Sequence, residues 1–187
     1  MAHRLTKIVT RSGDAGTTGL ADGSRLTKDS LRIVAVGEVD ELNSHLGVVL
    51  CQPLPDDVRR LLIGIQHDLF DLGGELAVPG ASLLAADLPV HLEAAVDHYN
   101  HDLPPLREFI LAGGTPAAAQ AHLARAVCRR AERSLVALGA AESVTETARK
   151  YLNRLSDLLF VLGRWLNRAQ GNDDVLWRKN RGSDAPS

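Results

Sequence analysis

Residues 121–138, with the sequence AHLARAVCRRAERSLVAL, decide the fold class of this chain. No residue in the stretch breaks a helix, and Ala, Leu and Arg are strong helix formers. At about 3.6 residues per turn, one narrow arc of the helix is charged and holds Arg125, Arg129, Glu132 and Arg133. A separate apolar stripe holds Ala124, Cys128, Ala131, Leu135 and Leu138. The stretch therefore predicts an amphipathic helix that packs one face against a core.

The charged arc carries more positive charge than its own acid can offset. Arg125 and Arg129, and again Arg129 and Arg133, stand at i and i+4, where like charges cost on the order of a few tenths of a kcal/mol. Only Glu132 compensates them locally. An anionic ligand or an acidic partner against this face explains the pattern. A solvated, arginine-rich surface is the alternative that this stretch leaves open.

Composition indicates one globular domain without a global charge field. The chain has 187 residues, 45% of them hydrophobic, and a formal net charge of −2. Since no basic field suggests nucleic acid, the arginine cluster favours a small anionic ligand. The two cysteines form no C-x-x-C pair, the N-terminus lacks a signal-peptide core, and no apolar run approaches roughly 18 residues. We expect a soluble, cytoplasmic protein that binds neither nucleic acid nor membrane.

Helical periodicity covers most of the remaining chain. Helices are predicted over residues 31–51, 56–77, 89–102, 116–139 and 144–170. Ser30, Thr115 and a capping box from Ser143 to Glu146 are the predicted start signals. Five helices of this length, joined by short to medium connections, predict an all-α five-helix bundle with no convincing strand.

The two ends of the chain differ from the predicted bundle. Residues 1–29 hold several glycines among Thr, Ser and Asp and lack a helical period, which predicts a glycine-rich N-terminal arm. The bundle spans residues 30–171 and ends at the stop signal of Gly171. Residues 172–187 form a polar tail with a lone Trp177, for which we expect fraying. Together these parts make one domain.

The arm contains TRSGDAGTTG at residues 10–19. Closely spaced glycines let backbone N–H groups converge on an anion, and the hydroxyls of Ser12, Thr17 and Thr18 add donors. Lys28 supplies a positive charge further along. The segment is not a Walker A motif, because G-x-x-x-x-G-K-[ST] is absent. Phosphate binding is one interpretation of the arm, and an ordinary glycine-rich loop is the other.

Further polar and sulfur-containing residues were considered as candidate functional groups. Asp40 and Glu41 either form a solvated face or meet the arginines of the fourth helix, within one chain or across a subunit boundary. Asn153 and Asp157 share a helix face at i and i+4, where they suit a ligand or a partner. The seven histidines form no compact ligand set, so no metal site is predicted. Cys128 lies on the apolar stripe and is expected to pack as a small hydrophobe.

Five motifs follow one another along nearly the whole chain. They are TRSGDxGTT from residue 10, DGSRxxKD from residue 22, GxVDELNS from residue 37, RAVCRRAER from residue 125 and YLNRLSD from residue 151. In this order they resemble the PduO-type ATP:cob(I)alamin adenosyltransferases. The resemblance implies a ferritin-like bundle, assembled as a homotrimer with active sites between subunits. It also implies transfer of the 5′-deoxyadenosyl group of ATP to the cobalt of cob(I)alamin, with release of triphosphate.

The resemblance assigns roles to individual residues. The implied ATP site consists of Thr10, Arg11, Ser12, Gly13, Thr18, Gly19, Lys28, Arg129, Arg130, Ala131, Glu132, Arg133 and Asn153. Asp40 and Arg125 resemble an inter-subunit acid–arginine pair and, with Arg129, are the implied catalytic residues. Phe109 resembles the aromatic beneath the corrin ring, and Phe160 is expected in the same cavity. Ala112 replaces the family's usual proline before the double glycine, which predicts a less stiff loop.

Substrates and partners follow from the same resemblance. ATP and cob(I)alamin are the implied substrates, with magnesium beside the triphosphate. A cobalamin reductase and an adenosylcobalamin-dependent mutase are the candidate protein partners. A hypothesis of another class remains: a non-catalytic helical-bundle module that senses or stores a nucleotide. Both hypotheses predict ATP binding, and only the enzyme consumes ATP when reduced cobalamin is added.

Overall fold

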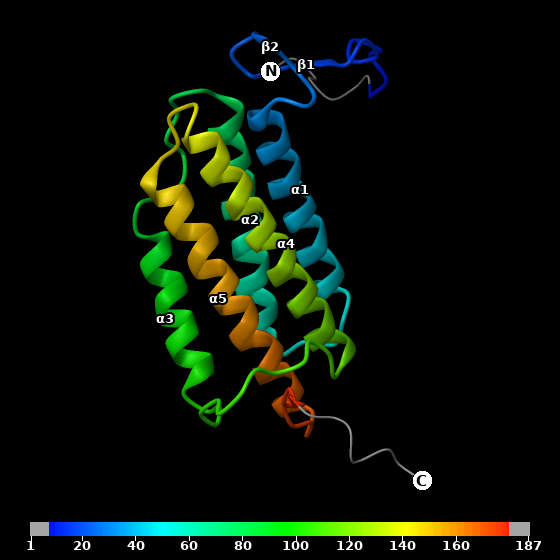
Figure 1. Cartoon of the computed structure of the whole chain (residues 1–187), viewed down its shortest axis with the longest axis vertical. Coiled ribbons are helices and arrows are strands. Elements are labelled where there is room, and N and C mark those ends of the chain that lie inside the picture. The colour runs from blue at the N-terminus through cyan, green and yellow to red at the C-terminus, as the bar shows by residue number, and fades with distance from the viewer. Residues whose placement is uncertain (1–7, 180–187) are drawn as a thin grey trace.

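The computed structural model of the chain describes residues 8–179. Its helices run lengthwise in an elongated bundle (Figure 1). They are α1 (Leu31–Leu50), α2 (Asp56–Ala77), α3 (Leu88–Asn100), α4 (Pro116–Gly139) and α5 (Glu146–Ala169). The predicted all-α, five-helix fold is confirmed, and each helix begins and ends within about two residues of its predicted bounds.

The core lies where α4 packs between α1 and α5, while α3 covers another side of α5. The predicted apolar stripe of α4 is fully buried in this core at Ala124, Cys128, Ala131, Leu135 and Leu138. Small residues on this stripe let the backbones of neighbouring helices approach closely. No helix within residues 8–179 is both long enough and apolar enough to cross a bilayer.

Helix starts follow the predicted signals only in part. The Thr115 hydroxyl accepts a hydrogen bond from the amide of Ala118 at 3.2 Å, as an N-cap does. The predicted capping box before α5 is wrong, because the N-cap is Thr145, which accepts from the amide of Ala148 at 3.2 Å. Thr145 also donates to Glu75 of α2 at 2.6 Å. Ser30 precedes α1, but its side chain makes no capping bond.

A short hairpin precedes the bundle, contrary to the expectation of no strand. Strand β1 (Thr17–Gly19) pairs antiparallel with β2 (Arg25–Thr27). Asp22 closes the turn by accepting hydrogen bonds from the amide and the hydroxyl of Ser24. Gly23 provides the left-handed conformation there, with φ of 88°. The hairpin lies beyond the N-terminal end of α1 (Figure 1).

The described part of the tail is paired with an earlier loop. The amide of Leu111 donates to the carbonyl of Val175 at 2.8 Å, and the amide of Trp177 donates to that of Phe109 at 2.7 Å. Residues 172–177, for which the sequence predicts fraying, thus contribute two hydrogen-bonded contacts to this loop. Residues 180–187 of the predicted tail lie outside the described part of the chain.

Candidate active site

A pocket of about 600 Å³ opens beside α4 and α5. The irregular segment at residues 106–110 forms one wall, and Arg125 and Phe160 form the other. Phe109 belongs to this segment and is 80% exposed, although it is a large apolar residue. The pocket thus brings together Phe109, Phe160 and Arg125, three residues that the family resemblance had assigned to one reaction.

Arg125 and His122 contact the same aromatic ring on the wall of the pocket. The guanidinium carbon of Arg125 lies 5.8 Å from the centroid of the Phe160 ring, a cation–π distance. The ring of His122 meets Phe160 edge-on, with 6.1 Å between centroids. Arg125 Nε is buried without a hydrogen-bond partner among the described residues. Because an unmade bond of this kind is costly, Arg125 is a donor available to a ligand.

His122 is a buried histidine that the sequence analysis did not single out. Its side chain fits against Gly163, where an added Cβ would lie 2.8 Å from Nε2. Burial lowers the pKa of His122, and the positive charge of Arg125 lowers it further. The ring that packs against Phe160 is therefore expected to be a neutral imidazole. Its only signal in the sequence is a polar residue one turn before Arg125.

The arginines of α4 are unequally neutralised within the chain. Arg130 forms ion pairs with Glu41 and Glu38 of α1. The side chain of Arg129 has no hydrogen bond or ion pair with any residue in the range 8–179. Arg133 donates to the carbonyl of Arg129 at 3.0 Å. Within the charged arc, Arg129 and Arg133 therefore keep donors for an anion, in addition to the unpaired Nε of Arg125.

Asp40 and Arg125 do not pair within one chain. Asp40 is exposed on α1, and its carboxylate has no hydrogen bond or ion pair inside the described region, whereas Arg125 faces the pocket. The neighbouring Glu41 does meet an arginine of α4 in the same chain, which answers half of the question that the sequence left open.

Asn153 is held in a network that links three helices. Its amide Nδ2 donates to Glu132 at 2.9 Å, and its Oδ1 accepts from Arg154 at 2.6 Å. Arg154 also donates to Glu93 of α3 at 2.5 Å. These bonds fix which end of the amide faces Glu132. Ala131, assigned to the ATP site by resemblance, is fully buried, so its side chain faces the core.

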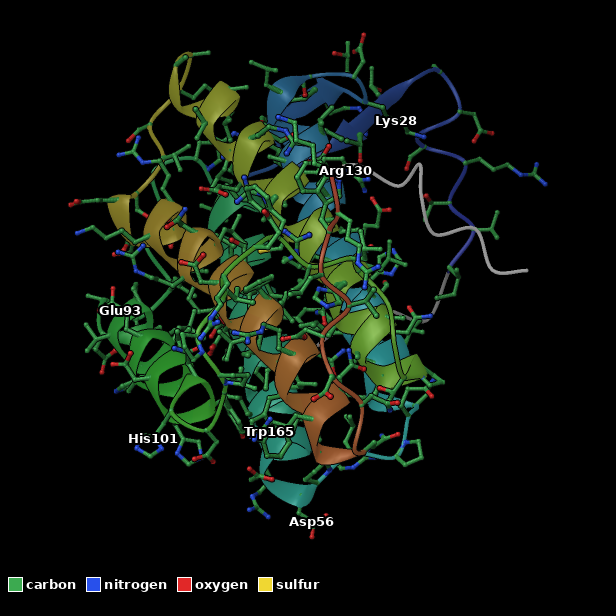
Figure 2. The ribbon with its side chains drawn as sticks, turned by 60° about the horizontal axis from the view of Figure 1, so that its bottom comes forward. Lys28, Asp56, Glu93, His101, Arg130 and Trp165 are labelled. Carbon is green, nitrogen blue, oxygen red and sulfur yellow. The ribbon has the colours of Figure 1, made fainter. Side chains whose placement is uncertain are left out.

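Arm residues are organised by Arg25, which belongs to the DGSRxxKD motif but had no role assigned to it from the sequence. Its Nη2 donates to the carbonyl of Ser12 and to the Thr17 hydroxyl, each at 2.7 Å. Lys28 lies close to Gly13, because a Cβ there would be 3.1 Å from Nζ. No hydrogen bond or ion pair among the described residues joins this arm to the arginines of α4. Lys28 and Arg130 nevertheless lie toward the same end of the bundle, away from Trp165 (Figure 2).

The remaining predicted arm residues lie within the same short segment. Thr10 and Ser12 share a hydrogen bond between their hydroxyls at 2.9 Å. Arg11 adopts a left-handed conformation with φ of 59°, unusual for a residue with a side chain. Thr18 and Gly19 belong to β1. The structure thus gathers the candidate phosphate ligands of the arm into one turn and one hairpin.

Comparisons with known proteins agree with this geometry. The sequence profile described as cobalamin adenosyltransferase matches residues 8–166. A cobalamin adenosyltransferase of Cupriavidus metallidurans is 65% identical over 184 residues, covering 98% of this chain and 100% of its own length. The corrinoid adenosyltransferase of Bacillus subtilis is 42% identical and covers 93% of both chains.

A solved structure extends the similarity to three dimensions. It is a variant of the PduO-type ATP:corrinoid adenosyltransferase from Lactobacillus reuteri, complexed with cobalamin and ATP. It aligns with a TM-score of 0.89 at 36% identity, covering 92% of this chain and 97% of that one. The similarity therefore spans the bundle and the pocket, and the chain belongs to the cobalamin adenosyltransferase family, in its PduO-type branch.

Proposed function

We infer that this protein is an ATP:corrinoid adenosyltransferase, which transfers the 5′-deoxyadenosyl group of ATP to the cobalt of cob(I)alamin and releases triphosphate. The observation that carries this inference is the pocket where Phe109, Phe160 and Arg125 meet. This pocket borders the helix that also presents Arg129, whose side chain has no partner within residues 8–179. A cavity with four apolar lining residues, on a helix that also carries arginine charge, suits a corrin ring and a polyphosphate together.

At the cobalamin end, Phe109 is assigned to the lower face of the corrin. Phe109 is 80% exposed, so its ring does not fill the core of the described chain and remains open to a ligand. An apolar side chain fills the lower axial position without coordinating cobalt. Co(II) that has no lower axial ligand is easier to reduce to Co(I). Co(I) is the nucleophile that attacks the ribose 5′ carbon. Phe160 and Arg125 form the opposing wall of the same cavity.

At the ATP end, arginine charge stabilises the leaving group. Arg129 and Arg133 are assigned to the triphosphate, whose negative charge grows as the bond to the 5′ carbon breaks. The arm, with Ser12, Gly13 and Lys28, is proposed to close over the nucleotide. Orienting two reactants in this way contributes on the order of 7–11 kcal/mol to lowering the barrier. Magnesium is proposed as the counter-ion of the triphosphate.

A homotrimer with shared sites is the proposed assembly. Its support is an exposed apolar surface on the two helices that carry the acid and the arginine. Val34 and Val48 of α1 are 38% and 43% exposed, and Leu123 and Val136 of α4 are 46% and 56% exposed. Apolar side chains flanking a charge suit a contact between subunits. There Asp40 of one chain would meet Arg125 of the next.

The cellular setting is proposed on chemical grounds. Because Co(I) is a strong reductant, a cobalamin reductase is the partner that must supply the substrate. An adenosylcobalamin-dependent mutase is the kind of enzyme that consumes the product. Cys51 and Cys128 are unpaired, which supports the reducing environment of the cytoplasm.

Anaerobic incubation with ATP, magnesium and chemically reduced cobalamin tests the proposed activity. The visible spectrum should change to that of the adenosylated product, and triphosphate should appear with it. A nucleotide sensor or storage module would bind ATP and leave both the nucleotide and the cobalamin spectrum unchanged. That outcome would reject the enzyme hypothesis in favour of the binding module.

A further inference from the structure

Packing of its own side chain does not hold Phe109 in place. The residue is 80% exposed and lies between α3 and α4, in a segment without helix or strand. Ala112 stands where the family resemblance calls for a stiffening proline. A ring that must stay beneath a corrin needs its backbone fixed by other means. The contacts around residues 104–115 identify those means.

Arg164 of α5 ties the beginning of this segment to the tail. Only 4% of its side chain is exposed. Its Nη2 donates to the carbonyl of Pro104 at 2.8 Å, and its Nε donates to Asp174 Oδ2 at 2.8 Å. The Asp174 side chain is itself only 14% exposed, so this ion pair is shielded from solvent and salt. Together the two residues form a clamp between the loop and the tail.

The tail connects this clamp to the backbone of Phe109. Beyond Asp174 the chain pairs with the pocket wall through two hydrogen bonds, Leu111 to Val175 at 2.8 Å and Trp177 to Phe109 at 2.7 Å. The second bond is accepted by the carbonyl of Phe109 itself. Fixing Asp174 therefore fixes the strand-like partner that holds the Phe109 backbone.

Asn167, one turn after Arg164, holds the other end of the segment. Its Oδ1 accepts from the amide of Thr115 at 2.9 Å, and its Nδ2 donates to the carbonyl of Gly113 at 3.1 Å. A Cβ on Gly114 would lie 2.2 Å from Oδ1, and φ there is 97°, so only glycine fits against this amide. The segment is thus anchored on both sides of Phe109 by one face of α5.

We propose that Arg164 and Asp174 are positioning residues for the reductive step: their ion pair holds the tail, and the tail holds Phe109 beneath cobalt. The proposal rests on the assigned role of Phe109 and adds the residues through which that role depends on α5. It explains how the loop keeps its place with Ala112 instead of proline.

The test compares Asp174→Ala, Asp174→Asn and Asp174→Glu with the wild type in two assays. One assay starts from cob(II)alamin that is reduced on the protein, and the other supplies cob(I)alamin ready-made. Asp174→Ala and Asp174→Asn should slow the first assay at least about tenfold, the effect of losing one charge-assisted hydrogen bond. The second assay should fall much less, and the KM for ATP should not change. Asp174→Glu should recover most of the loss.

Two further readouts separate positioning from a general loss of folding. The fraction of four-coordinate cob(II)alamin, measured by electron paramagnetic resonance with ATP bound, should drop in Asp174→Asn. The amides of Leu111 and Trp177 should exchange hydrogen faster, while those of the α4 core stay protected. Glu146→Ala is the matched control, because it removes an exposed ion pair with Lys150 on the same helix and should change neither readout.

Phe109→Ala provides the benchmark that separates the two proposals. If it shows the split between the assays and Asp174→Asn does not, the clamp is refuted and the role of Phe109 stands. If Phe109→Ala shows no split, the assigned role of Phe109 fails and the clamp proposal fails with it. Equal losses in both assays for Asp174→Asn would also refute the clamp, because the ion pair would then only stabilise the fold.

Discussion

Three arginines of α4 have three different environments. Arg125 lies over Phe160 in the pocket, Arg130 is paired with two glutamates of α1, and Arg129 has no partner among the described residues. Their similar positions on the helix do not distinguish them. The difference comes from the neighbouring helices, which offer an aromatic ring to one, carboxylates to another and solvent to the third. Carboxylates of the described residues neutralise Arg130, whereas Arg129 meets none and keeps its charge for an anionic ligand.

Arg129→Ala should therefore damage the reaction with ATP. A charge-assisted contact to phosphate contributes about 1.5–3 kcal/mol, so kcat/KM for ATP should fall roughly 10- to 150-fold. Steady-state kinetics with saturating cob(I)alamin measures this change. Arg60→Ala, on the exposed side of α2, is the control for the loss of one surface charge. Unchanged kinetics in Arg129→Ala would remove this residue from the ATP site.

His122 makes stability depend on pH in a direction that burial dictates. Its pKa in the folded protein lies below the ordinary value of 6.5, so the unfolded chain binds a proton more readily than the folded one. The stability that this residue contributes is complete above pH 6.5 and is lost as the pH falls below that value. His122→Leu should flatten this part of the stability curve.

Chemical denaturation at a series of pH values measures the effect of His122→Leu. A slope that is the same with and without His122 would mean that the folded protein binds a proton at this residue as readily as the unfolded chain does. The neutral support for Phe160 would then have to be abandoned.

At the level of elements, the arm and the tail contrast. The described tail is tied to the bundle by backbone pairing and a buried ion pair. The arm is held mainly by its own hairpin and by Arg25, with one backbone bond from Ala21 to the end of α2. A segment with few contacts to the core opens at little cost. The arm is therefore the element that we expect a nucleotide to order.

Limited proteolysis with and without ATP tests this expectation. Cleavage near residues 11–19 should slow with saturating ATP, by up to about a hundredfold at a concentration of 100 times Kd. The reason is that a ligand bound to the closed arm lowers the population of the open form. Arg25→Ala disrupts the turn around Ser12 and should reduce the protection. Identical cleavage in both states would contradict a closing arm.

At the scale of the whole molecule, α1 and α4 expose apolar residues near Asp40, whose carboxylate has no partner within residues 8–179, and this combination predicts association. If Asp40 pairs with Arg125 of a second chain, Asp40→Asn leaves the arginine without its counter-charge, which costs roughly 3–5 kcal/mol at a buried interface. Sedimentation velocity should show a trimer for the wild type. The variant should dissociate at protein concentrations at which the wild type is still a trimer. Asp71→Asn on α2 should sediment as the wild type does. A fully active, monomeric wild type would contradict the shared site.

Periodicity was sufficient to predict the bundle, because the apolar stripe of α4 repeats over a helix long enough to leave no ambiguity. It was insufficient for β1 and β2, whose three residues each are too few to show alternation. The start of α5 moved to Thr145 because Glu75, 70 residues away, adds a hydrogen bond there. Tertiary contacts of this kind leave no mark in a local pattern.

The candidate site was predictable to the extent that motifs name its residues. Phe109 and Phe160 were placed in one cavity by resemblance, and the pocket contains both. The supporting residues were missed, because His122, Arg164 and Asn167 look like ordinary helix positions in the sequence. Their roles depend on partners 10 to 60 residues away, such as Asp174 and Pro104 for Arg164.

The most direct test of the account is a single-turnover reaction with ATP labelled with carbon-13 at the ribose 5′ position. Enzyme, magnesium and cob(I)alamin are combined without oxygen, and the carbon and phosphorus resonances are followed by NMR. We predict that the labelled carbon becomes bonded to cobalt and that one intact triphosphate appears for each cobalt–carbon bond. Release of ADP and phosphate, or label that stays on ATP, would contradict adenosyl transfer by this protein.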